Sequence, residues 1–227
     1  MKNIQIIIIT AIIAAAGTFA DDIFFPSKKG MALTTASFNG KGKLEGYIRM
    51  SIRDVTGPAN NQTIVYTIQQ LDKNKQAGKN AAPEYATTVV NGVVEYSMEP
   101  YAALSGGKDI KITGTQMRVP SKLAPGDKIP DANAAMTLNM AIGKVTADIS
   151  MTNQRCTGIE TVTVPAGTFE CYKVERKSTT VADMLAKITM IDNTTVWYAR
   201  GIGAVKAVSY DEKGKLRSSS ELQELVR

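Results

Sequence analysis

Apolar and polar residues alternate along most of the chain, in short runs that end at clusters of Gly, Pro, Asn and Asp. In the clearest run, Val145, Ala147, Ile149 and Met151 fall on one face and polar residues fall on the other. An alternation with a period of two residues predicts a strand with one buried and one solvent-exposed face, as in an antiparallel sheet. The preceding run repeats this pattern with Met136, Leu138, Met140 and Ile142.

Turn chemistry separates these runs. Asn91-Gly92 lies between β-branched residues and predicts a tight hairpin, because both central positions of that turn take positive φ. Pro165-Ala166-Gly167 divides two further runs in the same way. The spacing predicts ten or more strands in an all-β sandwich, barrel or curled sheet. The one hint of a helical turn is Val181–Ala186.

Residues 1–20 have the pattern of a secretory signal peptide. Lys2 precedes an apolar stretch over 4–16, and small residues then lead to Ala20. The apolar core is too short for a membrane anchor, which needs about 20 residues. We therefore expect 1–20 to be removed, leaving 21–227 as a single exported β-rich domain in the periplasm or at the cell surface. No later stretch has the length of a membrane span.

The amino-acid composition excludes several kinds of catalytic and metal site. The chain has no histidine, which excludes a Ser-His-Asp or Cys-His pair and any imidazole metal ligand. Its two cysteines are too few for a Cys₄ zinc site. The formal charge of +6 is spread along the chain without long basic runs, so we expect no nucleic-acid partner. We also expect no cofactor, no metal site and no catalytic residues.

Export changes the interpretation of Cys156 and Cys171. In an oxidising compartment an even pair tends to be bridged, and the loop closed here would stabilise the fold by about 3 kcal/mol. The alternative is two buried thiols on neighbouring strands that point to different faces. The sequence leaves both open, because the separation of the two Cα atoms decides between them.

Three segments, taken in order, carry a family resemblance. They are Val119-Pro120 with Gly126-Asp127 and Pro130-Asp131, then 162–173 (VTVPAGTFECYK), then 196–206 (VWYARGIGAVK). Together they resemble the TapB-like family and related exported bacterial β-rich domains of unknown function. The resemblance covers about 85–227. It implies a single curled antiparallel sheet, a β-roll or an open barrel-like form with at most one short helix, in a bacterial envelope. It implies no catalytic residues.

The leading hypothesis is a non-enzymatic exported β-domain that binds an envelope component or has a structural role there. A second hypothesis is a periplasmic carrier of a lipid or other apolar ligand, because thioether side chains adapt to irregular apolar partners. The residues that would contact such a ligand are Trp197, Tyr198, Met136, Met140 and Met151.

A third, weaker hypothesis is a glycan hydrolase that uses paired carboxylates. No spacing in the sequence brings two of them together. The available carboxylates are Asp127, Asp131, Glu160, Glu170, Glu175, Asp183 and Asp192.

Overall fold

The computed structural model describes residues 23–78, 81–104, 108–140, 143–183 and 186–227. The predicted signal peptide lies outside these ranges. Within them the chain forms thirteen strands and one short helix. Their bounds are β1 (Ala32–Asn39), β2 (Leu44–Thr56), β3 (Gln62–Leu71), β4 (Glu84–Val90), β5 (Val93–Tyr96), α1 (Glu99–Leu104), β6 (Lys108–Thr115), β7 (Met117–Pro120), β8 (Ala132–Met140), β9 (Gly143–Val164), β10 (Gly167–Asp183), β11 (Lys187–Ala199), β12 (Gly203–Asp211) and β13 (Leu216–Val226).

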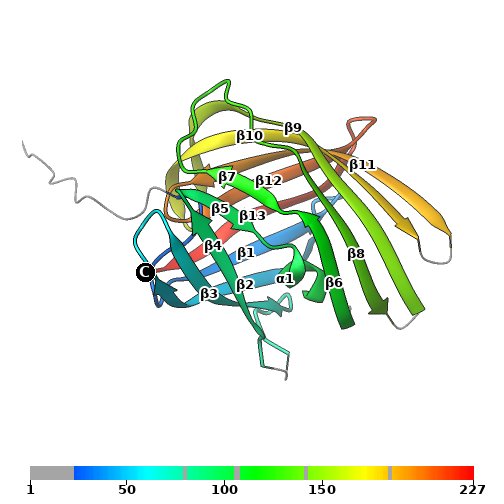
Figure 1. The fold of residues 1–227 in the computed structure, drawn as a ribbon, viewed down its shortest axis with the longest axis horizontal. Helices are drawn as coiled ribbons and strands as arrows, with labels where there is room; N and C mark the ends of the chain where they lie inside the picture. The colour runs from blue at the N-terminus through cyan, green and yellow to red at the C-terminus, as the bar shows by residue number, and fades with distance from the viewer. Residues whose placement is uncertain (1–22, 79–80, 105–107, 141–142, 184–185) are drawn as a thin grey trace, which may run out of the picture.

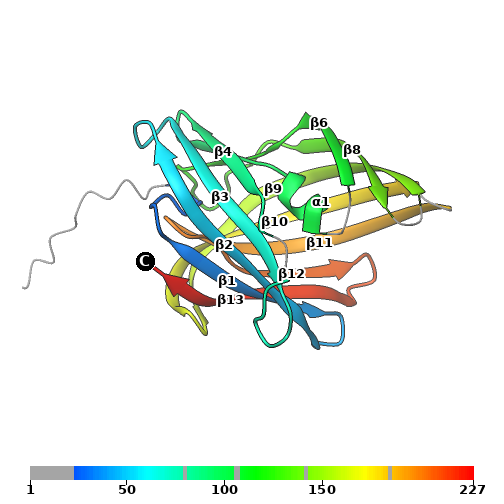
Figure 2. The ribbon, with the colours of Figure 1, turned by 90° about the horizontal axis from the view of Figure 1, so that it is seen from below.

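All thirteen strands belong to one sheet, in the order β6-β8-β9-β10-β11-β12-β13-β1-β2-β3-β4-β5-β7. Figures 1 and 2 show this sheet curling around a central space. Its two edge strands, β6 and β7, are consecutive in the chain, and they do not pair with each other. The prediction of an all-β, curled antiparallel sheet is confirmed, with one seam left open.

Two local predictions had different outcomes. Asn91 and Gly92 both take positive φ, 51° and 76°, in the turn between β4 and β5, as the hairpin pattern predicts. The predicted helical turn at 181–186 is wrong where the structure describes it, because Val181–Asp183 continues β10 and pairs with β9 and β11. The helix is instead α1, a single short segment between β5 and β6. Among the described residues, no helix combines the length and apolar character needed to cross a membrane.

The core of the molecule is organised around the segment 23–26. Ile23, Phe24 and Phe25 are 2%, 0% and 3% exposed, so they are buried as deeply as any strand residue. The Phe24 ring lies 5.0 Å from the ring of Tyr172, in an edge-to-face arrangement that favours aromatic pairs. Phe25 belongs to a second cluster, where its ring lies 5.5 Å from that of Tyr66. The segment therefore fills the inside of the curled sheet.

Backbone contacts hold the segment in place. The Gly201 N–H donates to the Ile23 carbonyl at 2.8 Å, and the Tyr96 hydroxyl donates to the Phe24 carbonyl. Gly203 takes φ of 90°, and a Cβ at this position would lie 3.3 Å from the Phe24 oxygen. Glycine at this position therefore permits both the turn and the close approach of the segment. Gly201 and Gly203 therefore have a structural role, because they hold segment 23–26 against β12.

The cysteines follow the second alternative left open by the sequence. Both are free and fully buried. Cys156 pairs in register with Val174, three residues from Cys171 along β10, and an odd offset places the two thiols on opposite faces. Three residues also span about 10 Å of strand, beyond the reach of a disulfide. The proposed bridge is therefore corrected to two separate thiols, each in a different apolar cluster.

We predict that Phe24→Ala lowers the free energy of unfolding by about 3–5 kcal/mol, because it removes a fully buried ring and leaves a cavity. Urea denaturation of the mature protein measures this change. Phe38→Ala, at a half-buried position, is the matched control and should cost clearly less. Equal losses for the two variants would show that segment 23–26 does not have the role described.

We predict that neither thiol reacts with a thiol reagent at pH 8 in the folded protein, and that both react after unfolding without reductant. Burial raises the pKa of Cys171 to about 11, assisted by the charges of Glu160 and Glu170, and burial also raises the pKa of Cys156. A raised pKa leaves little reactive thiolate. Mass spectrometry counts the adducts, and an unfolded, unreduced protein without free thiols would contradict the assignment.

Candidate binding site on the curled sheet

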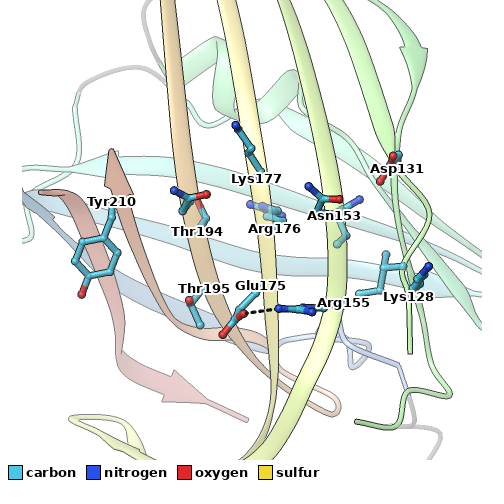
Figure 3. Close-up of a pocket in the computed structure, with 13 residues that line it drawn as sticks. Lys128, Asp131, Asn153, Arg155, Glu175, Arg176, Lys177, Thr194, Thr195 and Tyr210 are labelled. Atoms are coloured by element: carbon cyan, nitrogen blue, oxygen red, sulfur yellow. Dashed lines mark ion pairs between the residues drawn. The ribbon is translucent and has the colours of Figure 1, made fainter. Parts of the chain in front are cut away.

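A polar pocket of about 720 Å³ lies across the middle of β9, β10, β11 and β12. Its volume is within the range of about 300–1,000 Å³ typical of ligand sites. Figure 3 shows its residues on neighbouring strands and, for Lys128 and Asp131, on the loop that precedes β8. They are Lys128, Ile129, Asp131, Asn153, Gln154, Arg155, Glu175, Arg176, Lys177, Asn193, Thr194, Thr195 and Tyr210.

The pocket forms where β9 changes partners. Up to Met151, β9 pairs with β8; beyond a bulge, it pairs with the loop 123–131 instead. Asn153 lies in the bulge with φ of 55°, a conformation that asparagine tolerates better than most residues. The loop is tied to the strand by the Ile129 N–H, which donates to the Gln154 carbonyl at 2.9 Å, and by the Gln154 amide, which donates to Pro130 at 2.6 Å. These bonds bring loop residues beside the strands.

The alternation of the strands decides which side chains share a face. Val174 packs with Phe24 in the first core cluster, so its face is called the inner face of the sheet. Its neighbour Glu175 and the next odd residue, Lys177, therefore point to the opposite, outer face. Cross-strand pairing extends this outer face into two rows, which are Arg155, Glu175 and Thr195, and then Lys177, Asn193 and Tyr210.

The outer-face side chains carry a positive balance. Glu175 is flanked by two cations, with Arg155 Nη2 at 3.8 Å and Lys173 Nζ at 3.6 Å from its oxygens. Lys177 Nζ lies 3.7 Å from Glu212 at the rim. Exposed pairs of this kind contribute little to stability, about 0–1 kcal/mol each. Their charged groups are thus available to a polar ligand at little cost to the fold.

The structure separates the two aromatic residues predicted to contact a ligand. Tyr198 is 3% exposed and belongs to the inner core cluster with Phe24. Trp197 points to the outer face, where Lys173 and Lys206 lie 5.9 and 5.4 Å from its ring and Glu160 accepts its indole N–H. Adjacent strand residues point to opposite faces, so these two rings cannot contact one small ligand together.

The three methionines share a face, as the alternation predicts. Met136 pairs with Ala147, and Met151 pairs with Ala132, while Met140 ends β8; all three are half-buried. None of them lines the polar pocket. Nor do they line a smaller apolar cavity of about 200 Å³ inside the sheet, next to Phe25 and Pro26. Met136 lies in the middle of β8 and Met140 at its end, whereas Met151 lies in the middle of β9, two residues from Asn153 of the polar pocket.

Of the predicted carboxylates, Asp131 and Glu175 line the polar pocket together. Within the described part of the chain, no group of three or more acidic or cysteine residues could hold a metal ion. Arg155, Lys177 and Tyr210 line the pocket but were not predicted from the sequence as site residues. The only sign of them in the sequence is that they are polar residues of alternating runs. The pairing between strands is needed to show which of these polar residues lie side by side.

Comparisons with solved structures show the fold. A Bacteroides fragilis protein inferred to be exported, with a YmcC-like fold, has 23% sequence identity and a TM-score of 0.74, over 90% of this chain and 99% of that one. A protein of Parabacteroides distasonis inferred to be a lipoprotein has 20% identity and a TM-score of 0.73, over 90% of this chain and 98% of that one.

Among curated proteins, none matches the sequence. The family model described as DUF3108-like matches residues 28–222, which include all the strands except the end of β13. The TapB-like name is not confirmed, and the match extends further towards the N-terminus than the motifs that carried that resemblance. The chain belongs to the DUF3108-like family.

Proposed function

We propose that the protein is an exported, non-enzymatic binding module of the bacterial cell envelope, acting in the periplasm or at the cell surface. Residues 21–227 form its single domain after removal of 1–20. The signal-peptide pattern supports export. The two structural neighbours, inferred to be an exported protein and a lipoprotein, support the same location.

The observation that carries a binding role is the polar pocket. Its outer-face residues offer cations at Arg155 and Lys177, amide and hydroxyl groups at Asn193 and Thr195, and a ring at Tyr210, which is 40% exposed. Cations that line a pocket attract anionic ligands, and the amide and hydroxyl groups can orient them. The ligand class that fits is a polar, anionic component of the envelope.

Catalysis has less support than binding. A retaining or inverting glycosidase needs two carboxyl groups facing one bond with different roles. In this pocket Glu175 is held between two cations, while Asp131 comes from the loop beside β9. The chain also lacks histidine as a general base. The charged groups therefore fit recognition of a ligand better than its hydrolysis.

We predict that replacing Arg155 and Lys177 together by Ala weakens binding of the mature protein to protease-treated envelope membranes by about tenfold. Removing two exposed cations eliminates two charged contacts, each worth up to about 1 kcal/mol where solvent screens them, and a tenfold change corresponds to about 1.4 kcal/mol. Cosedimentation measures the affinity, and binding of the wild type should fall as salt is raised, because exposed charges are screened.

The matched control replaces Lys111 and Lys144, which are exposed on β6 and at the start of β9; Lys144 lies nine residues, about 30 Å of strand, before Asn153 of the pocket. This variant removes the same charge and should bind like the wild type. Equal weakening in both variants would mean that net charge, rather than the pocket, governs binding. Absence of binding by the wild type would refute the proposed function.

A further inference from the structure

The inner face of the sheet carries small side chains where β11, β12, β13, β1 and β2 run side by side. Cross-strand pairing places five residues in one row across these strands, which are Val196, Ala207, Ser220, Ser37 and Gly46. Directly opposite residues share a face, and Val196 belongs to the first core cluster, so the whole row points inside. Alanine, serine and glycine are too small to fill the interior of a curled sheet to the usual packing density. The row therefore leaves space inside the molecule.

Two adjoining cavities occupy this space, and Ser37 and Ser220 line both of them. The first has a volume of about 420 Å³ and is rich in hydroxyl groups, from Ser37, Thr194, Ser209, Ser218, Ser219 and Ser220. The second has a volume of about 200 Å³ and is mainly apolar, with Phe25, Leu33, Ile48, Met50, Ile68 and Ile202 among its residues. Together they reach the size of about 300–1,000 Å³ that is typical of ligand sites.

The two cavities differ in their access to solvent. Ser218 and Glu45, which line the hydroxyl-rich cavity, are exposed. Phe25, Leu33 and Ile68, which line the apolar cavity, are buried. A ligand with one polar and one apolar end is therefore bound best with its polar end in the open, hydroxyl-rich cavity. Its apolar end is then removed from water in the buried cavity, which is the favourable direction of the hydrophobic effect.

The residues that line the cavities favour an uncharged ligand. Among those that the structure describes, Glu45 is the one charged side chain. Its carboxylate repels an anionic group, and no cation in the lining compensates the desolvation of that group. A cationic group would gain at most about 1 kcal/mol from this exposed carboxylate, which does not offset the loss of its hydration. Serine and threonine hydroxyls both donate and accept hydrogen bonds, so they match the hydroxyl groups of a neutral head.

We propose that the two cavities together bind an uncharged single-chain lipid whose head carries hydroxyl groups, of the monoglyceride class. The head lies among the hydroxyl groups of Ser37, Ser218 and Ser220, and the acyl chain extends past them into the apolar cavity towards Phe25. A dry apolar cavity of about 150 Å³ holds the six carbons of benzene, so one of about 200 Å³ holds a chain of about eight carbons.

This inner site goes beyond the proposed function, because it differs from the outer pocket in position and in the charge of its ligand. Thr194 is the one residue that lines both the hydroxyl-rich cavity and the polar pocket. Ser37 and Ser220, at the junction of the two inner cavities, do not line the polar pocket. Substitutions at these two serines therefore test the inner site alone.

The probe is 1-monooctanoylglycerol, titrated below its micelle concentration into the mature protein and followed by isothermal titration calorimetry. It should bind saturably, because its head and chain match the two cavities. Octanoate and octylamine carry chains of the same length on charged heads, and each should bind at least about tenfold more weakly, because the site does not compensate the lost hydration of a charge. Glycerol should not bind measurably, since it has no chain to bury.

The decisive variant is Ser37→Leu, which places a bulky side chain at the junction of the cavities. It should weaken binding of 1-monooctanoylglycerol at least about tenfold while the melting transition is retained, because the chain can no longer pass. Ser220→Leu blocks the same junction from β13 and replaces the first variant if that one does not fold. Ser150→Leu is the matched control, at a half-buried serine of β9 that lines neither cavity, and it should bind like the wild type.

Four results would overturn the proposal. They are absence of saturable binding of 1-monooctanoylglycerol by the wild type, equal or tighter binding of octanoate or octylamine, unchanged affinity in a folded variant at Ser37 or Ser220, and equal weakening in the Ser150 control. The comparison of charged and uncharged heads uses the wild type, so it decides even if neither junction variant folds. The variant at Arg155 and Lys177 should bind 1-monooctanoylglycerol normally, which separates a failure of the inner site from a failure of the outer pocket.

Discussion

The burial of segment 23–26 inside the curled sheet is the constraint on which the rest of the structure depends. A sheet that curls almost to closure encloses a volume, and protein interiors do not tolerate large empty spaces. The strands alone supply few large rings, since aromatic residues make up 6% of the chain. Phe24 and Phe25 supply two of them, and they join aromatic groups from β3, β5, β10 and β11 into adjoining clusters. These residues follow shortly after the cleavage position that the sequence predicts, so the predicted start of the mature chain coincides with the core segment.

Strand alternation then divides the chemistry between two faces. Glu175, Arg176 and Lys177 are consecutive in sequence, yet the middle residue points inside and its neighbours point outside. The outer pair lines the solvent-exposed polar pocket, whereas the Arg176 side chain reaches the inner side, where its Nη1 donates to the Met117 sulfur. The same rule separates Trp197 from Tyr198 and Cys156 from Cys171. Side chains alternate between the two faces of a strand, which explains why several residues that are close in the sequence do not share a site.

Irregularities in strand pairing determine where the polar pocket forms. The bulge at Asn153 ends the pairing of β8 with β9 and lets the loop 123–131 take over, which brings Lys128 and Asp131 beside the strands. A bulge adds one residue on one strand and increases local twist and bending. Gly203 has a related role, because its bare backbone lets the N-terminal segment approach. Small departures from regular pairing thus bring loop residues to the polar pocket and let segment 23–26 approach β12.

The sequence by itself determined the all-β class, the Asn91-Gly92 hairpin and the apolar faces of β8 and β9, because period and turn chemistry are local properties. It also limited the available chemistry through the absence of histidine. The tertiary structure alone decided which strands are neighbours, and so which polar residues meet: Arg155 with Glu175, and Arg176 with Thr194. Bulges shift register by one residue, and a shift of one exchanges the two faces of a strand. That information lies in pairing between distant segments, which is why the cysteines were undecided and the site residues were missed.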